Sequence, residues 1–169
     1  MNLELYPEAT AETETLEMNH HRVLVVDDEE TMREFAVEAL AHGGYQAMAV
    51  ESGVAAMKAL RAEHFDLVLT DFNMPNGTGS DLIIKMHLEG FMMPVIMMTG
   101  AALTKELMTL MSMLHVGCVL QKPFRIDELI HVVDRALQPG QEMPASLVHP
   151  EMATGVEGSL SNSPHKPRF

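Results

Sequence analysis

Residues able to hold a phosphoryl group and a metal ion stand at the ends of four short apolar segments. These segments end in turn at the pair Asp27 and Asp28, at Asp71, at Thr99 and just before Lys122. Short apolar runs of this kind predict buried β-strands. In an open parallel α/β sheet, ligands bind outside the carboxyl ends of the strands. Carboxylates, a hydroxyl and an ammonium at one such edge would suit a divalent cation and a phosphoryl group.

Asp71 is the predicted nucleophile of this set. A carboxylate that attacks phosphorus forms an acyl phosphate, and the two anions repel as they approach. Transfer therefore depends mainly on positioning and charge neutralisation. We expect Lys122 to pair with a phosphoryl oxygen as a point charge, and the Thr99 hydroxyl to rotate towards another.

A Mg²⁺ ion bound by hard oxygen ligands would supply further neutralisation. Because Asp27 and Asp28 are adjacent, their side chains diverge, so we expect Asp28 to bind the ion directly and Asp27 to act through water. Asp71 and the backbone carbonyl of Asn73 complete the predicted metal ligands. Each acidic residue alone would be explained as a helix N-cap, but their shared position at successive strand ends favours a site.

The segments between these residues predict the elements that position them. Helical apolar periodicity alternates with five apolar runs, at 22–27, 45–50, 66–71, 94–99 and 118–121. Five such β/α pairs predict a parallel sheet buried on both faces, with right-handed crossovers and helices on both sides. Glycines placed to adopt left-handed C-cap conformations follow three of the helices: Gly43-Gly44, Gly90 and Gly117.

Composition limits the classes of partner and the domain organisation. The formal net charge of −13 argues against nucleic acid and against anionic membrane surfaces, which require clustered Lys and Arg. One cysteine, no signal sequence and no apolar run of membrane-spanning length predict a cytoplasmic chain. We expect a disordered acidic arm at 1–20, one domain at 21–138, and a disordered tail rich in Pro, Gly and Ser at 139–169.

Four motifs together resemble the receiver domain of two-component response regulators. They are Val25–Glu29, Asp71–Pro75, Thr99–Gly100 and Lys122–Phe124, and the resemblance covers about residues 21–138. It implies a flavodoxin-like doubly wound fold, with five parallel strands in the order 2-1-3-4-5 and five helices.

The resemblance also implies partners and a role. Asp71 would take its phosphoryl group from a sensor histidine kinase or a histidine phosphotransfer protein. Thr99 would then move to the phosphate and remodel the face formed by the fourth helix, fifth strand and fifth helix, which a target protein reads. We expect a stand-alone regulator resembling those of chemotaxis, which is a phosphoacceptor switch and not an enzyme with an external substrate.

Val119 departs from the family pattern, which has an aromatic residue at that position, three before Lys122. A β-branched side chain cannot make the aromatic swing, so an alternative is an interaction module that signals without phosphate. A third hypothesis, an Asp-based phosphatase or mutase, ranks last. Such enzymes place a second Asp two residues after the nucleophile, where this chain has Asn73, which cannot act as an acid.

The fourth helical segment carries an unusual number of methionines. An inward stripe is predicted from Leu107, Leu110, Met111 and Leu114, with Met108 and Met113 on its flanks. Flanking Met side chains suit an adaptable surface for a protein partner or a second copy of the chain. Met97 and Met98 are expected to be core packing, and Cys118 a small buried apolar residue.

Overall fold

The computed structural model of the chain describes residues 21–75, 77–138 and 146–148. Its main sheet contains six strands, each parallel to its neighbours. In spatial order the strands are β2 (Gln46–Val50), β1 (Arg22–Val26), β3 (Leu67–Asp71), β6 (Val95–Thr99), β7 (Cys118–Gln121) and β8 (Ser146–Val148). A separate antiparallel pair joins β4 (Asn73–Met74) to β5 (Gly77–Thr78).

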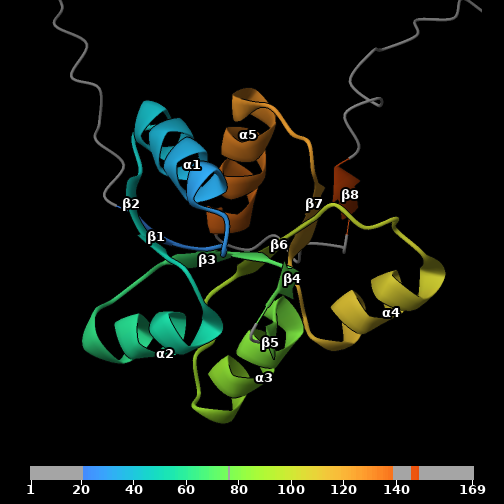
Figure 1. Cartoon of the computed structure of the whole chain (residues 1–169). Helices are drawn as coiled ribbons and strands as arrows, with labels where there is room; N and C mark the ends of the chain where they lie inside the picture. The colour runs from blue at the N-terminus through green and yellow to red at the C-terminus, as the bar shows by residue number, and fades with distance from the viewer. Residues whose placement is uncertain (1–20, 76, 139–145, 149–169) are drawn as a thin grey trace, which may run out of the picture.

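Five helices in the described residues cover the two faces of this sheet. They are α1 (Glu30–His42), α2 (Gly53–Ala62), α3 (Gly79–Leu88), α4 (Lys105–Met113) and α5 (Ile126–Leu137). Helices α1 and α5 lie on one face, and α2, α3 and α4 lie on the other (Figure 1). Alternating side chains of the central strands therefore enter two different cores.

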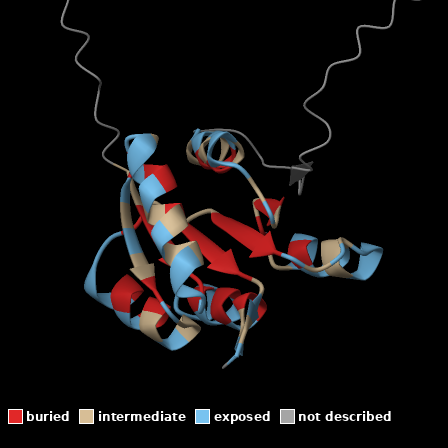
Figure 2. Cartoon of the chain, turned by 45° about the horizontal axis from the view of Figure 1, so that its top comes forward, coloured by how far each residue is buried: buried red, intermediate tan, exposed pale blue. Residues whose placement is uncertain are grey.

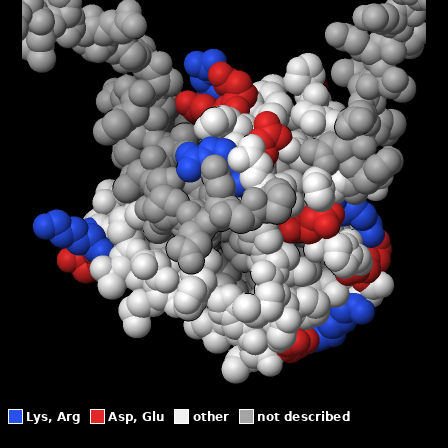
Figure 3. All heavy atoms as spheres, turned by 180° about the vertical axis from the view of Figure 1, so that it is seen from behind, with Lys and Arg blue, Asp and Glu red and all other residues white. Residues whose placement is uncertain are grey.

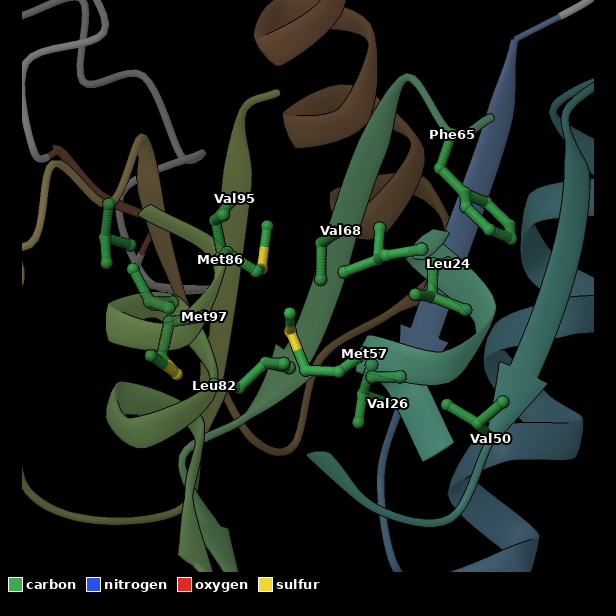
Figure 4. Close-up of a cluster of buried hydrophobic side chains, with 14 of the residues drawn as sticks. Leu24, Val26, Val50, Met57, Phe65, Val68, Leu82, Met86, Val95 and Met97 are labelled. Atoms are coloured by element: carbon green, nitrogen blue, oxygen red, sulfur yellow. The ribbon is translucent and has the colours of Figure 1, made fainter. Parts of the chain in front are cut away.

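Both faces of the central strands are packed, which explains their almost continuous apolar sequences. Every residue of β3 and β6 is buried (Figure 2). On the face of α2 and α3, strand side chains such as Val26 and Val68 pack with Met57 and Leu82 (Figure 4). On the other face, strand side chains pack against α1 and α5.

The predicted fold class is confirmed, because the expected order 2-1-3-4-5 corresponds to β2-β1-β3-β6-β7. The sixth strand, β8, was not predicted. Strand β8 lies in the segment 139–169, for which a disordered tail was expected. It pairs with β7. The remainder of that segment and the arm at 1–20 lie outside the described residues.

Local signals account for most helix ends. Gly44 and Gly90 adopt the left-handed conformation after α1 and α3, as predicted. After α4 the left-handed residue is His115, with φ 54°, and not Gly117. Gly117 is already aligned with the sheet, where its N–H donates to the carbonyl of Val95 at 3.0 Å, so the chain has to reverse earlier.

The methionines divide between core and surface. Met97 and Met98 are 1% and 0% exposed, so their predicted packing role is confirmed, and Cys118 is buried as predicted. Burial raises the pKa of the Cys118 thiol to about 11, which keeps it protonated at neutral pH.

Helix α4 follows its predicted stripe only in part. Met111 is fully buried, but Leu110 is 37% exposed, so the inward stripe is narrower than predicted. Met108 packs partly against the core, whereas Met113 is 72% exposed.

Exposed charges are mixed in sign. Among the described residues visible in Figure 3, Lys and Arg side chains lie beside Asp and Glu. Among the ion pairs of the described residues, Arg22 pairs with Glu63 and Arg61 with Glu89. In the part of the chain that the structure describes, no helix has the length and apolar character required to cross a bilayer.

Candidate functional site

Three of the predicted residues converge at the carboxyl edge of the sheet. The Lys122 Nζ lies 2.7 Å from Asp27 Oδ2 and 2.6 Å from Asp71 Oδ1. Asp27 follows β1, Asp71 ends β3 and Lys122 follows β7. The Lys122 N–H donates to the Thr99 carbonyl at 2.7 Å, which ties the start of this loop to β6. Two carboxylates thus share one ammonium.

Backbone amides fix the remaining oxygen of each carboxylate. Asp27 Oδ1 accepts a hydrogen bond from the Glu29 N–H at 2.9 Å. Asp71 Oδ2 accepts one from the Asn73 N–H at 2.6 Å. Each carboxylate is therefore held by the loop that follows its strand and by Lys122.

Burial sets the electrostatics of this cluster. It raises the pKa of Asp71, and the hydrogen bond and charge of Lys122 offset that rise only in part. Burial by itself would lower the pKa of Lys122, but hydrogen bonds and charge from Asp27 and Asp71 outweigh it, and the pKa is raised. Lys122 consequently remains a cation at neutral pH.

Thr99 lies next to the cluster at the end of β6 and is 1% exposed. Its Oγ1 accepts a hydrogen bond from the Ala101 N–H at 3.0 Å. The hydroxyl is thus positioned by the loop that leads to α4. The strand pairing sets Asp71 opposite Met98, one residue before Thr99.

Asp28 and Asn73 are placed differently from the three converging residues. Asp28 is exposed and lines a neighbouring pocket of about 210 Å³ together with residues such as Ser52 and Met74. Asn73 is exposed and begins the β4–β5 pair. The predicted division of labour, with Asp28 binding a metal directly and Asp27 through water, is not tested by this arrangement and stays a prediction.

The oxygen chemistry of the cluster fits a hard divalent cation. Asp27 and Asp71 carry more negative charge than Lys122 neutralises, and both present carboxylate oxygens at the same edge. Mg²⁺ is commonly held by one or two carboxylates while it keeps several waters. Within the described ranges, however, no three His, Cys, Asp or Glu side chains gather closely enough to hold a metal.

Two supporting residues were not predicted. The Arg33 Nη1 donates to the backbone carbonyls of Asp27 and Asp28, each at 2.9 Å, and so braces the loop between β1 and α1. Gly79 begins α3 so close to β3 that an added Cβ would lie 2.4 Å from the Asp71 carbonyl oxygen. Arg33 could have been found from the sequence, because it is a basic residue in the first turn of the helix that follows the acidic pair. No local sequence signal marks Gly79.

Comparison with known proteins agrees with this architecture. A family model described as the response regulator receiver domain matches residues 23–134. The regulatory protein AtoC of Escherichia coli (strain K12) is 33% identical over 150 residues, which cover 85% of this chain and 32% of AtoC. The chain spans about a third or less of the length of the curated relatives it matches.

Two solved structures are similar in fold and sequence. Chemotaxis protein CheY4 of Vibrio cholerae matches with a TM-score of 0.65 and 26% identity, over 70% of this chain and 99% of that one. Response regulator TrrA of Thermotoga maritima, solved in complex with Mg²⁺ and BeF, matches with a TM-score of 0.62 and 30% identity. This match covers 69% of this chain and 99% of TrrA.

Proposed function

The chain belongs to the response regulator receiver domain family, and from this premise we propose that Asp71 accepts a phosphoryl group from a phosphohistidine. The donor is a sensor histidine kinase or a histidine phosphotransfer protein. The observation that carries the proposal is the buried cluster in which Asp27 and Asp71 share Lys122 at 2.7 and 2.6 Å.

The transfer forms one bond and breaks one bond. A carboxylate oxygen of ionised Asp71 attacks phosphorus, and the bond between phosphorus and the imidazole nitrogen of the donor breaks. Lys122 then pairs with an oxygen of the transferred group, because its ammonium already lies against Asp71. The Thr99 hydroxyl turns towards another of these oxygens.

Mg²⁺ would be held by Asp27, Asp28 and Asp71 with the backbone carbonyl of Asn73. When bound, the ion supplies neutralisation of the phosphoryl oxygens. The TrrA complex contains Mg²⁺, which supports this choice of metal. Hydrolysis of the Asp71 phosphate returns the switch to its resting state, so the chain acts as a switch and turns over no external substrate.

The signal is read by proteins at the face formed by α4, β7 and α5. Met113 on α4 is 72% exposed and offers a flexible apolar contact to a target or to a second copy of the chain. A cytoplasmic location is part of the proposal, since the kinases that supply the phosphoryl group need ATP. The stand-alone form of the regulator stays a prediction.

Phosphate uptake tests the proposal. With Mg²⁺ and a small phosphodonor such as phosphoramidate, the wild-type protein should gain the mass of one phosphoryl group, and Asp71→Asn should gain none. Asp127→Asn is the matched control, because that carboxylate is exposed on α5. Uptake by Asp71→Asn equal to that of the wild type would contradict the assignment of the acceptor.

A second candidate, the phosphate-independent interaction module, is favoured by one residue. Val119 stands where the family has an aromatic side chain, and it is 1% exposed. A beryllofluoride adduct should shift amide signals of α4 and β7 under the switch proposal. Shifts limited to the surroundings of Asp71 would favour the module instead.

A further inference from the structure

Gln121 carries a buried polar atom with no partner. Its side-chain Oε1 accepts no hydrogen bond. Among the described residues, the Ser80 Oγ is the only other buried side-chain polar atom without a hydrogen-bond partner. A buried acceptor without a donor destabilises the state that contains it. Gln121 also immediately precedes Lys122 in the chain and ends β7.

The sheet register places Gln121 beside Thr99. In the pairing of β6 with β7, Thr99 is the partner of Gln121. Met97 and Val119, two residues earlier on each strand, both belong to the core on the α2, α3 and α4 side. Because side chains alternate along a strand, Thr99 and Gln121 face this same side.

One backbone donor beyond the end of β6 depends on Thr99 for its acceptor. The Ala101 N–H donates to the Thr99 Oγ1 at 3.0 Å. When Thr99 turns to a phosphoryl oxygen, as the proposed function requires, the Ala101 N–H loses that acceptor. The resting state therefore has an acceptor without a donor, and the phosphorylated state would have a donor without an acceptor.

We propose that Gln121 is a positioning residue of the switch, whose amide oxygen takes over the Ala101 N–H when Thr99 turns to the phosphate. This inference rests on the proposed function and adds a step to it. In the resting state Gln121 Oε1 is unpaired, and in the phosphorylated state both groups are satisfied. The exchange favours the phosphorylated conformation and holds the loop before α4 in its new place.

The exchange offers a coupling route that does not need the aromatic swing. Val119 cannot make that swing, but Gln121 lies on the same strand, two residues nearer to the site. Movement of the Gln121 amide would link Thr99 to β7 and so to the face of α4, β7 and α5.

Hydrogen exchange of the Ala101 amide tests this step. It is measured by NMR on the full chain, with and without Mg²⁺ and beryllofluoride. In the wild type the amide should stay protected in both states. In Gln121→Met it should be protected at rest and lose about tenfold or more of its protection once the adduct forms. Gln46→Met, the same change at the exposed start of β2, is the control and should behave as the wild type.

The outcomes separate the inference from the proposed function. The Asn73 amide, which donates to Asp71 Oδ2, reports adduct formation in each protein. If no protein shows an adduct, both the proposed function and the inference fail. If the adduct forms but the wild-type Ala101 amide itself loses about tenfold or more of its protection, the inference alone is overturned. That wild-type result decides the matter even where the variant does not fold.

Discussion

At the scale of single residues, Asp71 has a charge that its surroundings compensate only in part. It is 6% exposed and shares Lys122 with Asp27. Burial raises its pKa despite this ammonium. The fold thus keeps a carboxylate whose ionised form burial disfavours. This excess of negative charge is what a cation or a phosphoryl transfer would use.

Asp71→Asn should stabilise the fold at neutral pH when no divalent cation is present. A carboxyl group whose pKa is higher in the folded than in the unfolded state binds protons more tightly when folded, so its ionised form costs stability. This cost is absent below the ordinary pKa of 3.8 and grows as the pH rises through the folded-state value. The variant should therefore melt higher than the wild type at pH 7, and the difference should vanish below pH 3.8.

Thermal unfolding followed by circular dichroism across this pH range measures the effect. Lys122→Met gives the opposite control, because it leaves two buried carboxylates without an ammonium and should melt lower than the wild type at neutral pH. If Asp71→Asn raised the melting temperature equally at pH 7 and below pH 3.8, the cost of the ionised carboxylate would not be the cause.

At the scale of elements, the passage from β3 to α3 holds the acceptor in place. The Gly79 N–H donates to the Phe72 carbonyl at 3.0 Å. An added Cβ at Gly79 would lie 2.4 Å from the Asp71 carbonyl oxygen and 2.9 Å from the Met97 sulfur. Helix α3 can begin this close to the acceptor only because the residue has no side chain.

Gly79→Ala should lower the free energy of unfolding by about 1–3 kcal/mol, because the start of α3 would have to shift away from β3. Gly53→Ala is the matched control at the first residue of α2, where a Cβ would lie 3.6 Å from Leu82. It should be neutral or stabilise by about 0.4–1 kcal/mol. Urea unfolding of both variants measures the difference, and equal losses would rule out the close approach as the cause.

At the scale of the whole molecule, β8 pairs with the edge of β7 that faces away from β6. Three residue pairs join them, from Cys118 with Ser146 to Leu120 with Val148. Strand β7 also belongs to the proposed signalling face, between α4 and α5 in Figure 1. The C-terminal segment thus covers a strand edge that would otherwise be open to another chain.

Leu147→Pro should uncover this edge, because proline cannot donate to the strand ladder. Amides of β7 that donate to β8 should exchange faster with solvent, whereas those that donate to β6 should keep their rates. Hydrogen exchange followed by NMR measures both sets, and Glu151→Pro, beyond β8 in the sequence, is the control. Unchanged exchange along β7 would mean that the β8 pairing does not protect this edge.

The sequence alone determined the five strands β2, β1, β3, β6 and β7, the fold class and the residues that reach the carboxyl edge. Apolar runs and polar strand ends are local signals, and parallel topology brings such ends together whatever the helices contain. For that reason Asp27, Asp71, Thr99 and Lys122 can be predicted from the sequence without knowledge of their contacts.

Only the tertiary structure decided which carboxylates share the ammonium of Lys122. That Asp27 and not Asp28 joins Lys122 depends on the course of the β1–α1 loop, which Arg33 braces through two carbonyls. The close approach at Gly79, the orphaned oxygen of Gln121 and the pairing of β8 all depend on residues far apart in the chain. Local pattern carries no information about such distances, because they are set by how the packed elements meet.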